Sequence, residues 1–101
     1  MNDYAYQIQG ILEAPSGEIL GMRVIVCNVH NFDTVDVPVE VFDNETISYL
    51  KFRLKANSHI DVKKLPISVQ NKIRTPLGRW LDHWVLEHYY GATSKRKDTN
   101  A

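Results

Sequence analysis

The sequence predicts an α+β domain: an antiparallel sheet of three to four strands, arranged as a meander or small open barrel, followed by a short and a long C-terminal helix packed on it. Apolar residues alternate along much of the first half, turn residues separate these stretches, and an amphipathic segment with two tryptophans follows at residues 75–91. The length of 101 residues fits one domain. We assign residues 1–92 to it and expect residues 93–101, which are polar and basic, to form a disordered tail.

The first two strands are predicted at residues 4–13 and 19–29. A turn containing Pro15 and Gly17 separates them, so they form a β-hairpin. Gly10 interrupts the first strand and indicates a bulge or a close approach of another backbone. The inward face is expected to carry Tyr6, Ile8 and Leu12 from the first strand and Leu20, Met22, Val24 and Val26 from the second.

A third strand is predicted after a loop at residues 30–34. Val35, Val37, Val39 and Val41 alternate with polar residues and Pro38, which is the cleanest period of two in the chain. Because Pro38 has no N–H to donate, this strand must have a free edge there, or a bulge.

Residues 46–56 allow two readings. As a helix, the segment would be capped by Asp43 or Asn44 and would present Ile47, Leu50 and Leu54 on one face. As a strand, it alternates apolar and basic residues, and this reading is favoured over the helix. The basic residues would then lie beside the acidic residues of the third strand.

Two helices are predicted in the second half, separated by a break at residues 74–76. Ser68 caps the short one, which ends at Ile73, and Thr75 with Pro76 begins the long one, which Gly91 ends. Trp80 and Trp84 lie on the apolar stripe of the long helix and are expected to be core. The remaining predicted core residues of this half are Leu50, Leu54, Val69, Ile73, Leu77 and Leu81.

The net charge is zero, but it is unevenly distributed along the chain. Residues 1–50 carry one basic and eight acidic side chains, whereas residues 51–101 carry eleven basic and four acidic ones. Such a division suggests contact with a nucleic acid or membrane, or a charged tail, but pairing of the charges across the surface is the favoured explanation.

No catalytic constellation is evident, so we expect a protein that is not an enzyme and needs no cofactor or metal. His83 and Glu87 share a helix face, but no third metal ligand is apparent beyond His30 or His59. Cys27 sits in an apolar strand and is expected to be core.

The preferred function is a small non-catalytic binding or regulatory module that contacts another protein or a second copy of itself. Leu86 and Tyr90 lie on the long helix away from its apolar stripe, beside Arg79 and His83. An apolar and aromatic strip with charged neighbours is typical of a partner site or a homodimer seam.

The alternative function is binding of RNA or single-stranded DNA by the basic half. On the strand reading of residues 46–56, bases project from one sheet face with an aromatic residue in line, as in single-strand binders. The residues expected to bind are Tyr49, Lys51, Arg53, Lys55, Lys72 and Arg74.

The single cysteine cannot form an internal disulfide, which favours the reducing cytoplasm. The N-terminal residues do not resemble a signal peptide, and no apolar run is long enough to cross a membrane, so no membrane partner is expected.

Overall fold

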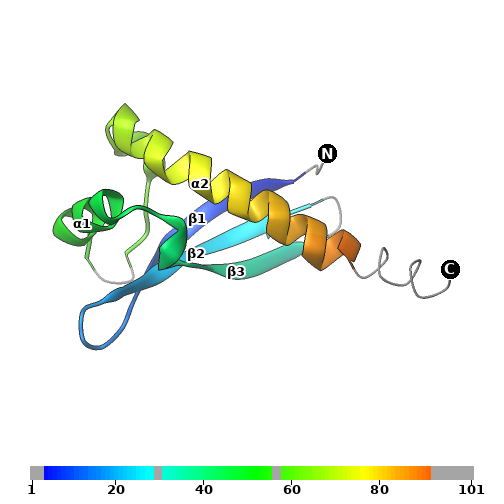
Figure 1. Ribbon diagram of the computed structural model, residues 1–101, viewed down its shortest axis with the longest axis horizontal. Coiled ribbons are helices and arrows are strands. Elements are labelled where there is room, and N and C mark those ends of the chain that lie inside the picture. Colours follow the sequence, from blue (N-terminus) through cyan, green and yellow to red (C-terminus); the bar gives the residue numbers. More distant parts are fainter. Residues whose placement is uncertain (1–3, 29–30, 56–57, 92–101) are drawn as a thin grey trace, which may run out of the picture.

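The computed structural model describes residues 4–28, 31–55 and 58–91, so the tail expected at 93–101 lies outside the described residues. It contains β1 (Ala5–Glu13), β2 (Ile19–Cys27), β3 (Phe32–Pro38), α1 (Asn44–Arg53) and α2 (Ile67–Val85). Short 3₁₀ turns η1 (Val39–Val41) and η2 (Val62–Lys64) connect them, and a π-helical turn, η3 (Leu86–Gly91), ends α2. The predicted α+β class is confirmed: an antiparallel sheet is followed by a short and a long helix (Figure 1).

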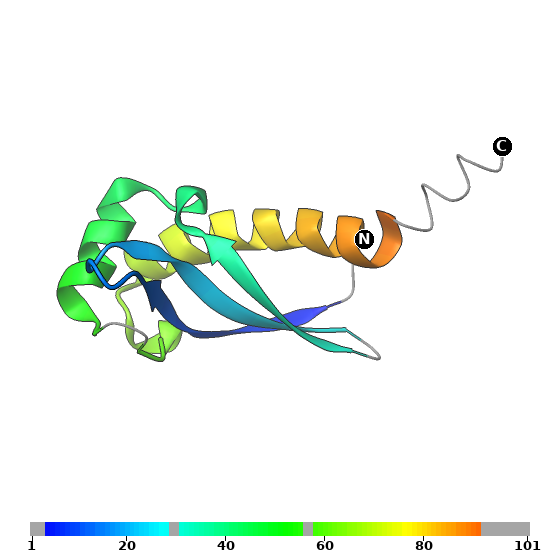
Figure 2. The same ribbon diagram turned by 90° about the horizontal axis from the view of Figure 1, so that it is seen from below.

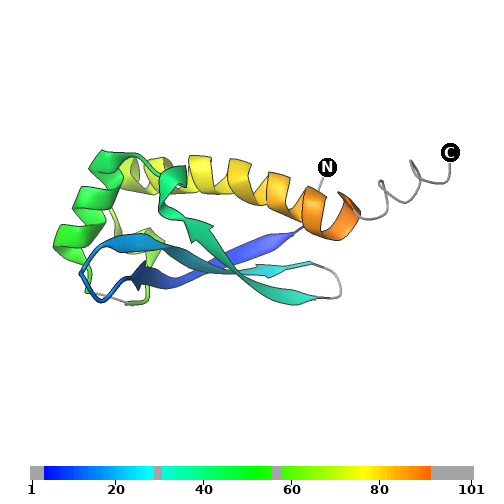
Figure 3. The same ribbon diagram turned by 60° about the horizontal axis from the view of Figure 1, so that its bottom comes forward.

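The sheet is a meander with the order β1-β2-β3, and α2 lies along one of its faces (Figure 2). Figure 3 shows α1 at one end of the sheet, beside the start of α2. The core lies between the covered face and α2. It is made of Ile8, Ile11, Ile19, Met22, Val24, Val26, Val35, Val37, Phe42, Leu50, Ile60, Ile73, Leu77, Leu81 and Val85.

Gly10 is both a bulge and a point of close approach, as predicted. The register between β1 and β2 shifts between Ile8 and Gly10, and Ile11 donates its N–H to the carbonyl of Ser58 at 3.1 Å. The bulge moves Ile11 to the buried face and leaves Leu12 half-buried, so the expected core position of Leu12 was wrong.

A second irregularity, between Leu12 and Glu13, changes which residues of β2 face the core. Ile19 is buried and Leu20 is 52% exposed, contrary to the predicted inward position of Leu20. Gly21 has a φ of +159°, which accompanies this change in alternation. Beyond it, Met22, Val24 and Val26 face inward as predicted.

The third strand is placed earlier than predicted. β3 begins at Phe32, inside the expected loop, and ends at Pro38, after which Val39 and Val41 form a 3₁₀ turn and are half-buried. β3 is an edge strand, which confirms the reading of Pro38 as a residue that requires a free edge.

The strand favoured at residues 46–56 is instead the helix α1. The side chain of Asp43 accepts a hydrogen bond from the N–H of Thr46 at 2.7 Å, so the N-cap of the alternative reading is the one that forms. Leu50 is fully buried, whereas Phe52, which the strand reading aligned with it, is 85% exposed. Lys51 and Arg53 lie in the last turn, where cations interact favourably with the helix dipole.

The two predicted C-terminal helices are one continuous helix, so the expected break at residues 74–76 was wrong. α2 starts at Ile67, after Pro66, and passes through Pro76. A proline inside a helix costs one hydrogen bond and some strain. The buried stripe of Ile73, Leu77 and Leu81 spans Pro76, and its packing on the sheet offsets that cost.

The two tryptophans lie at the margin of the core. Trp80 and Trp84 are half-buried and pack against it, whereas the fully buried positions of α2 are smaller aliphatic residues. Both indole rings were predicted to be core, but the structure leaves both residues partly exposed. Trp84 also stacks on His88, with ring centroids 4.3 Å apart.

The two glycines at positions 10 and 78 should respond oppositely to replacement by alanine. A Cβ at position 10 would lie 2.6 Å from the carbonyl oxygen of Ser58, whereas one at position 78 would meet no atom within 4 Å. We expect Gly78→Ala to stabilise the protein by about 0.5–1 kcal/mol, because alanine is the better helix former. Gly10→Ala should lower the free energy of unfolding, measured by urea denaturation; equal effects of the two substitutions would contradict this packing.

Candidate functional site

The outer face of α2 and η3 carries the four residues predicted to bind a partner. Arg79 and His83 are exposed, and Leu86 and Tyr90 are 48% and 46% exposed. The opposite side of the same helix supplies Leu81 and Val85 to the core. We call Arg79, His83, Leu86 and Tyr90 the α2 strip.

Two tyrosines hold this end of the helix on the sheet. The hydroxyl of Tyr89 donates to the carboxylate of Asp33 at the start of β3, and the hydroxyl of Tyr4 donates to Asp82 at 2.6 Å. Burial, followed by the bond to Asp33, raises the pKa of Tyr89 to about 12. Burial and Asp82 also raise the pKa of Tyr4. The α2 strip is therefore presented by a helix end that is fixed from two positions.

Phe32 is another exposed ring at this end of the molecule. It is 80% exposed and immediately precedes Asp33, the residue that Tyr89 contacts. Its register partner is Cys27, whose thiol is half-buried. The expectation that Cys27 is a core residue was therefore wrong, because only one face of the sheet is covered by α2.

The residues predicted for nucleic-acid binding do not form a row on a sheet, because they lie on α1, just after it, and on α2. Lys51, Arg53 and Lys55 are exposed at the end of α1. The Arg53 guanidinium lies 5.6 Å from the ring centroid of Tyr49 and 6.0 Å from that of Phe52. Cations over aromatic faces are favourable, so basic and aromatic groups gather here by a different geometry from the predicted one.

The other two predicted residues lie on α2. Lys72 forms a salt bridge with Glu45 across the gap between α1 and α2, so its charge is already paired. Arg74 lies further along α2 and lines a separate hollow. Of the six residues that the sequence named, the structure therefore brings Tyr49 and Arg53 into contact.

A hollow of about 490 Å³ separates α1 from the start of α2, beside this salt bridge. Thr46 lines it and is buried, and its hydroxyl oxygen has no hydrogen-bond partner among the described residues. An unpartnered buried hydroxyl costs folding free energy.

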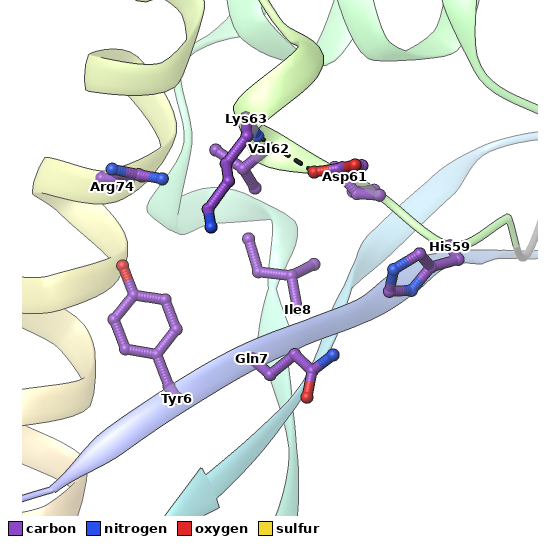
Figure 4. Close-up of a pocket in the computed structure, with 9 residues that line it drawn as sticks. Tyr6, Gln7, Ile8, His59, Asp61, Val62, Lys63 and Arg74 are labelled. Carbon is purple, nitrogen blue, oxygen red and sulfur yellow. Dashed lines mark hydrogen bonds between the residues drawn. The ribbon is translucent and has the colours of Figure 1, made fainter.

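A larger hollow, of about 630 Å³, was not predicted. It lies between β1, the segment around η2, and α2, and residues distant in sequence surround it (Figure 4). Its polar residues include Tyr6, His59, Asp61, Lys63 and Arg74. The sequence analysis named Arg74 for nucleic-acid binding, His59 as a possible metal ligand and Tyr6 as a core residue, but it did not connect them. No local spacing relates these residues to one another or to Asp61 and Lys63.

Among the described residues, the structure brings no third metal ligand to His83 and Glu87. His59 lines the hollow beside β1 and its Nδ1 donates to the carbonyl of Gln9 at 3.1 Å, while His30 lies outside the described residues. Within the described ranges, no three His, Cys, Asp or Glu side chains are grouped as a metal site.

No described helix combines the length and apolar character needed to cross a membrane.

Comparisons with known proteins give no relative: no family model, curated protein or solved structure matches this chain.

The tyrosine that anchors the α2 strip should make folding sensitive to alkaline pH. The folded-state pKa of Tyr89, about 12, lies above its ordinary value of 10.0, so the folded state holds the proton more tightly. This contribution is complete below pH 10 and is lost as the pH rises from 10 to 12. The ¹³C shift of the Tyr89 Cζ, followed against pH, should give a midpoint near 12; a midpoint near 10 would contradict the buried contact.

Proposed function

We propose that this protein is a non-catalytic binding module that associates with a second copy of itself through the α2 strip. The observation that carries the proposal is the half-exposure of Leu86 and Tyr90 on a helix whose other face is core. Exposed apolar and aromatic side chains beside charged ones are common at the centres of protein interfaces.

A second copy is a suitable partner because the two ends of the α2 strip carry chemically complementary side chains. Two copies of α2 packed antiparallel would bring Arg79 and His83 of one copy against the turn with Leu86, Glu87 and Tyr90 of the other. The Arg79 guanidinium of one copy can then lie over the Tyr90 ring of the other, and the His83 imidazole can pair with the Glu87 carboxylate. A two-fold interface requires this kind of reciprocal contact.

The charge distribution also supports a second copy. Residues 4–43 carry six acidic and one basic side chain, whereas residues 44–74 carry seven basic and two acidic ones. The sheet is therefore acidic and the end with α1 and η2 is basic. This uneven distribution gives the molecule a charge dipole, which favours the encounter of two copies in opposite orientations.

Light scattering after size-exclusion chromatography tests the proposal. We expect a mass near twice 11.6 kDa at micromolar concentration, falling towards 11.6 kDa on dilution. Leu86→Glu should abolish the dimer, since it places a carboxylate within the seam. Leu20→Glu is the matched control, because Leu20 is equally exposed at 52% but lies on β2. A wild-type protein that is monomeric at all concentrations would rule the seam out.

A second candidate function, binding of RNA or single-stranded DNA, is favoured by the basic and aromatic cluster on α1. Phe52 offers a ring on which a base can stack, and Arg53, Lys51 and Lys55 can contact phosphates. Neutral net charge weighs against a dedicated binder.

Fluorescence anisotropy with a labelled single-stranded oligonucleotide tests this candidate. We expect affinity to fall steeply between 50 and about 200 mM salt, because phosphate contacts release counterions. Phe52→Ala should weaken binding by the loss of one stacked base, about 1–3 kcal/mol. Ile67→Ala removes another exposed apolar side chain, at the start of α2, and serves as the control. No binding at 50 mM salt would exclude the candidate.

A further inference from the structure

The hollow beside β1 has an apolar floor and a basic rim. Ile8 and Ile60 are buried at its base, and Val62 is half-buried beside them. Lys63 reaches it from η2 and Arg74 from α2. The two cations therefore come from segments that are packed together only in the folded protein.

Three donor groups converge on the same space. In Figure 4 the ammonium group of Lys63 lies above Ile8, and the hydroxyl of Tyr6 points towards Arg74. Within the described residues neither Lys63 nor Arg74 forms an ion pair, and the Tyr6 hydroxyl makes no hydrogen bond. Two unpaired cations that face one space repel each other, and an anion between them would remove that cost.

The rim also carries one acidic residue. The carboxylate of Asp61 lines the hollow and accepts the backbone N–H of Lys63 at 3.2 Å, where it caps η2, so Lys63 and Arg74 leave the lining with a positive excess. Burial raises the pKa of Tyr6, and the nearby Arg74 opposes this shift without cancelling it. The Tyr6 phenol therefore keeps its proton at neutral pH and can donate it to an acceptor.

We propose that this hollow binds a small phosphate monoester. The Arg74 guanidinium can hold two phosphate oxygens, Lys63 adds a second positive charge, and the Tyr6 hydroxyl donates to a third oxygen. The apolar floor formed by Ile8 and Val62 contacts the organic part of the ligand. This site is separate from the α2 strip, because Arg74 lies in the first half of α2 and the strip lies at its end.

Titrations of ¹⁵N-labelled full-length protein test the proposal, with adenosine 5′-monophosphate, adenosine and inorganic phosphate as probes at low ionic strength. We expect the monophosphate to shift the amide signals of residues 6–8 and 59–63. Inorganic phosphate should shift the same signals more weakly, and adenosine should leave them unchanged. No shift with either phosphate probe would overturn the proposal.

Neighbouring residues supply matched controls. Lys63→Gln should weaken binding of the monophosphate about tenfold or more, because a charge-assisted hydrogen bond is lost. Lys64→Gln removes the same charge one residue away, outside the lining of the hollow, and should change affinity less than about twofold. Arg74→Gln should weaken binding in the same way. Equal losses in Lys63→Gln and Lys64→Gln would contradict a defined site.

Two further measurements separate this proposal from the proposed functions. Leu86→Glu should retain binding of the monophosphate, so the hollow is tested even if self-association fails. A single-stranded oligonucleotide that shifts residues 6–8 and 59–63, with no shift from the monophosphate, would overturn the proposal in favour of nucleic-acid binding.

Discussion

The structure depends on the packing of one helix against one face of a small sheet. Ile73, Leu77, Leu81 and Val85 form a buried stripe along α2, and Met22, Val24 and Val26 of the central strand face it. A three-stranded sheet cannot protect its own apolar face, so without α2 these valines would be exposed to water. The same packing keeps α2 continuous through Pro76, where local propensity favours a break.

The surfaces available for binding follow from this packing. Because α2 covers the sheet with one side, its other side presents Leu86 and Tyr90 outward, and Tyr89 fixes that end on β3. Where the first half of α2 passes β1, Arg74 comes beside Lys63, and the hollow forms between them. One docking contact therefore positions both the proposed seam and the proposed phosphate site, at different points along the same helix.

The sequence predicted the fold class because alternation and helical periodicity are local signals that the packing preserves, as in Val35 and Val37 or Leu77 and Leu81. It failed where a single contact outweighed a pattern. The Asp43 cap favours a helix over residues in which Leu50 and Phe52 alternate with bases. The two irregularities in the pairing of β1 with β2 place Ile11 and Ile19 in the core instead of Leu12 and Leu20. The exposure of the α2 strip followed from the helix periodicity. The hollow did not, because Tyr6, Lys63 and Arg74 are brought together only by tertiary structure.

We propose that α2 uses two faces, one buried in its own chain and one that contacts a second copy. An isotope-filtered nuclear Overhauser experiment on an equal mixture of labelled and unlabelled protein tests this most directly. We expect contacts between the Leu86 methyl groups of one copy and the Tyr90 ring of the other, while Leu81 and Val85 contact only residues of their own chain. Intermolecular contacts confined to the sheet, or none at all, would contradict the account.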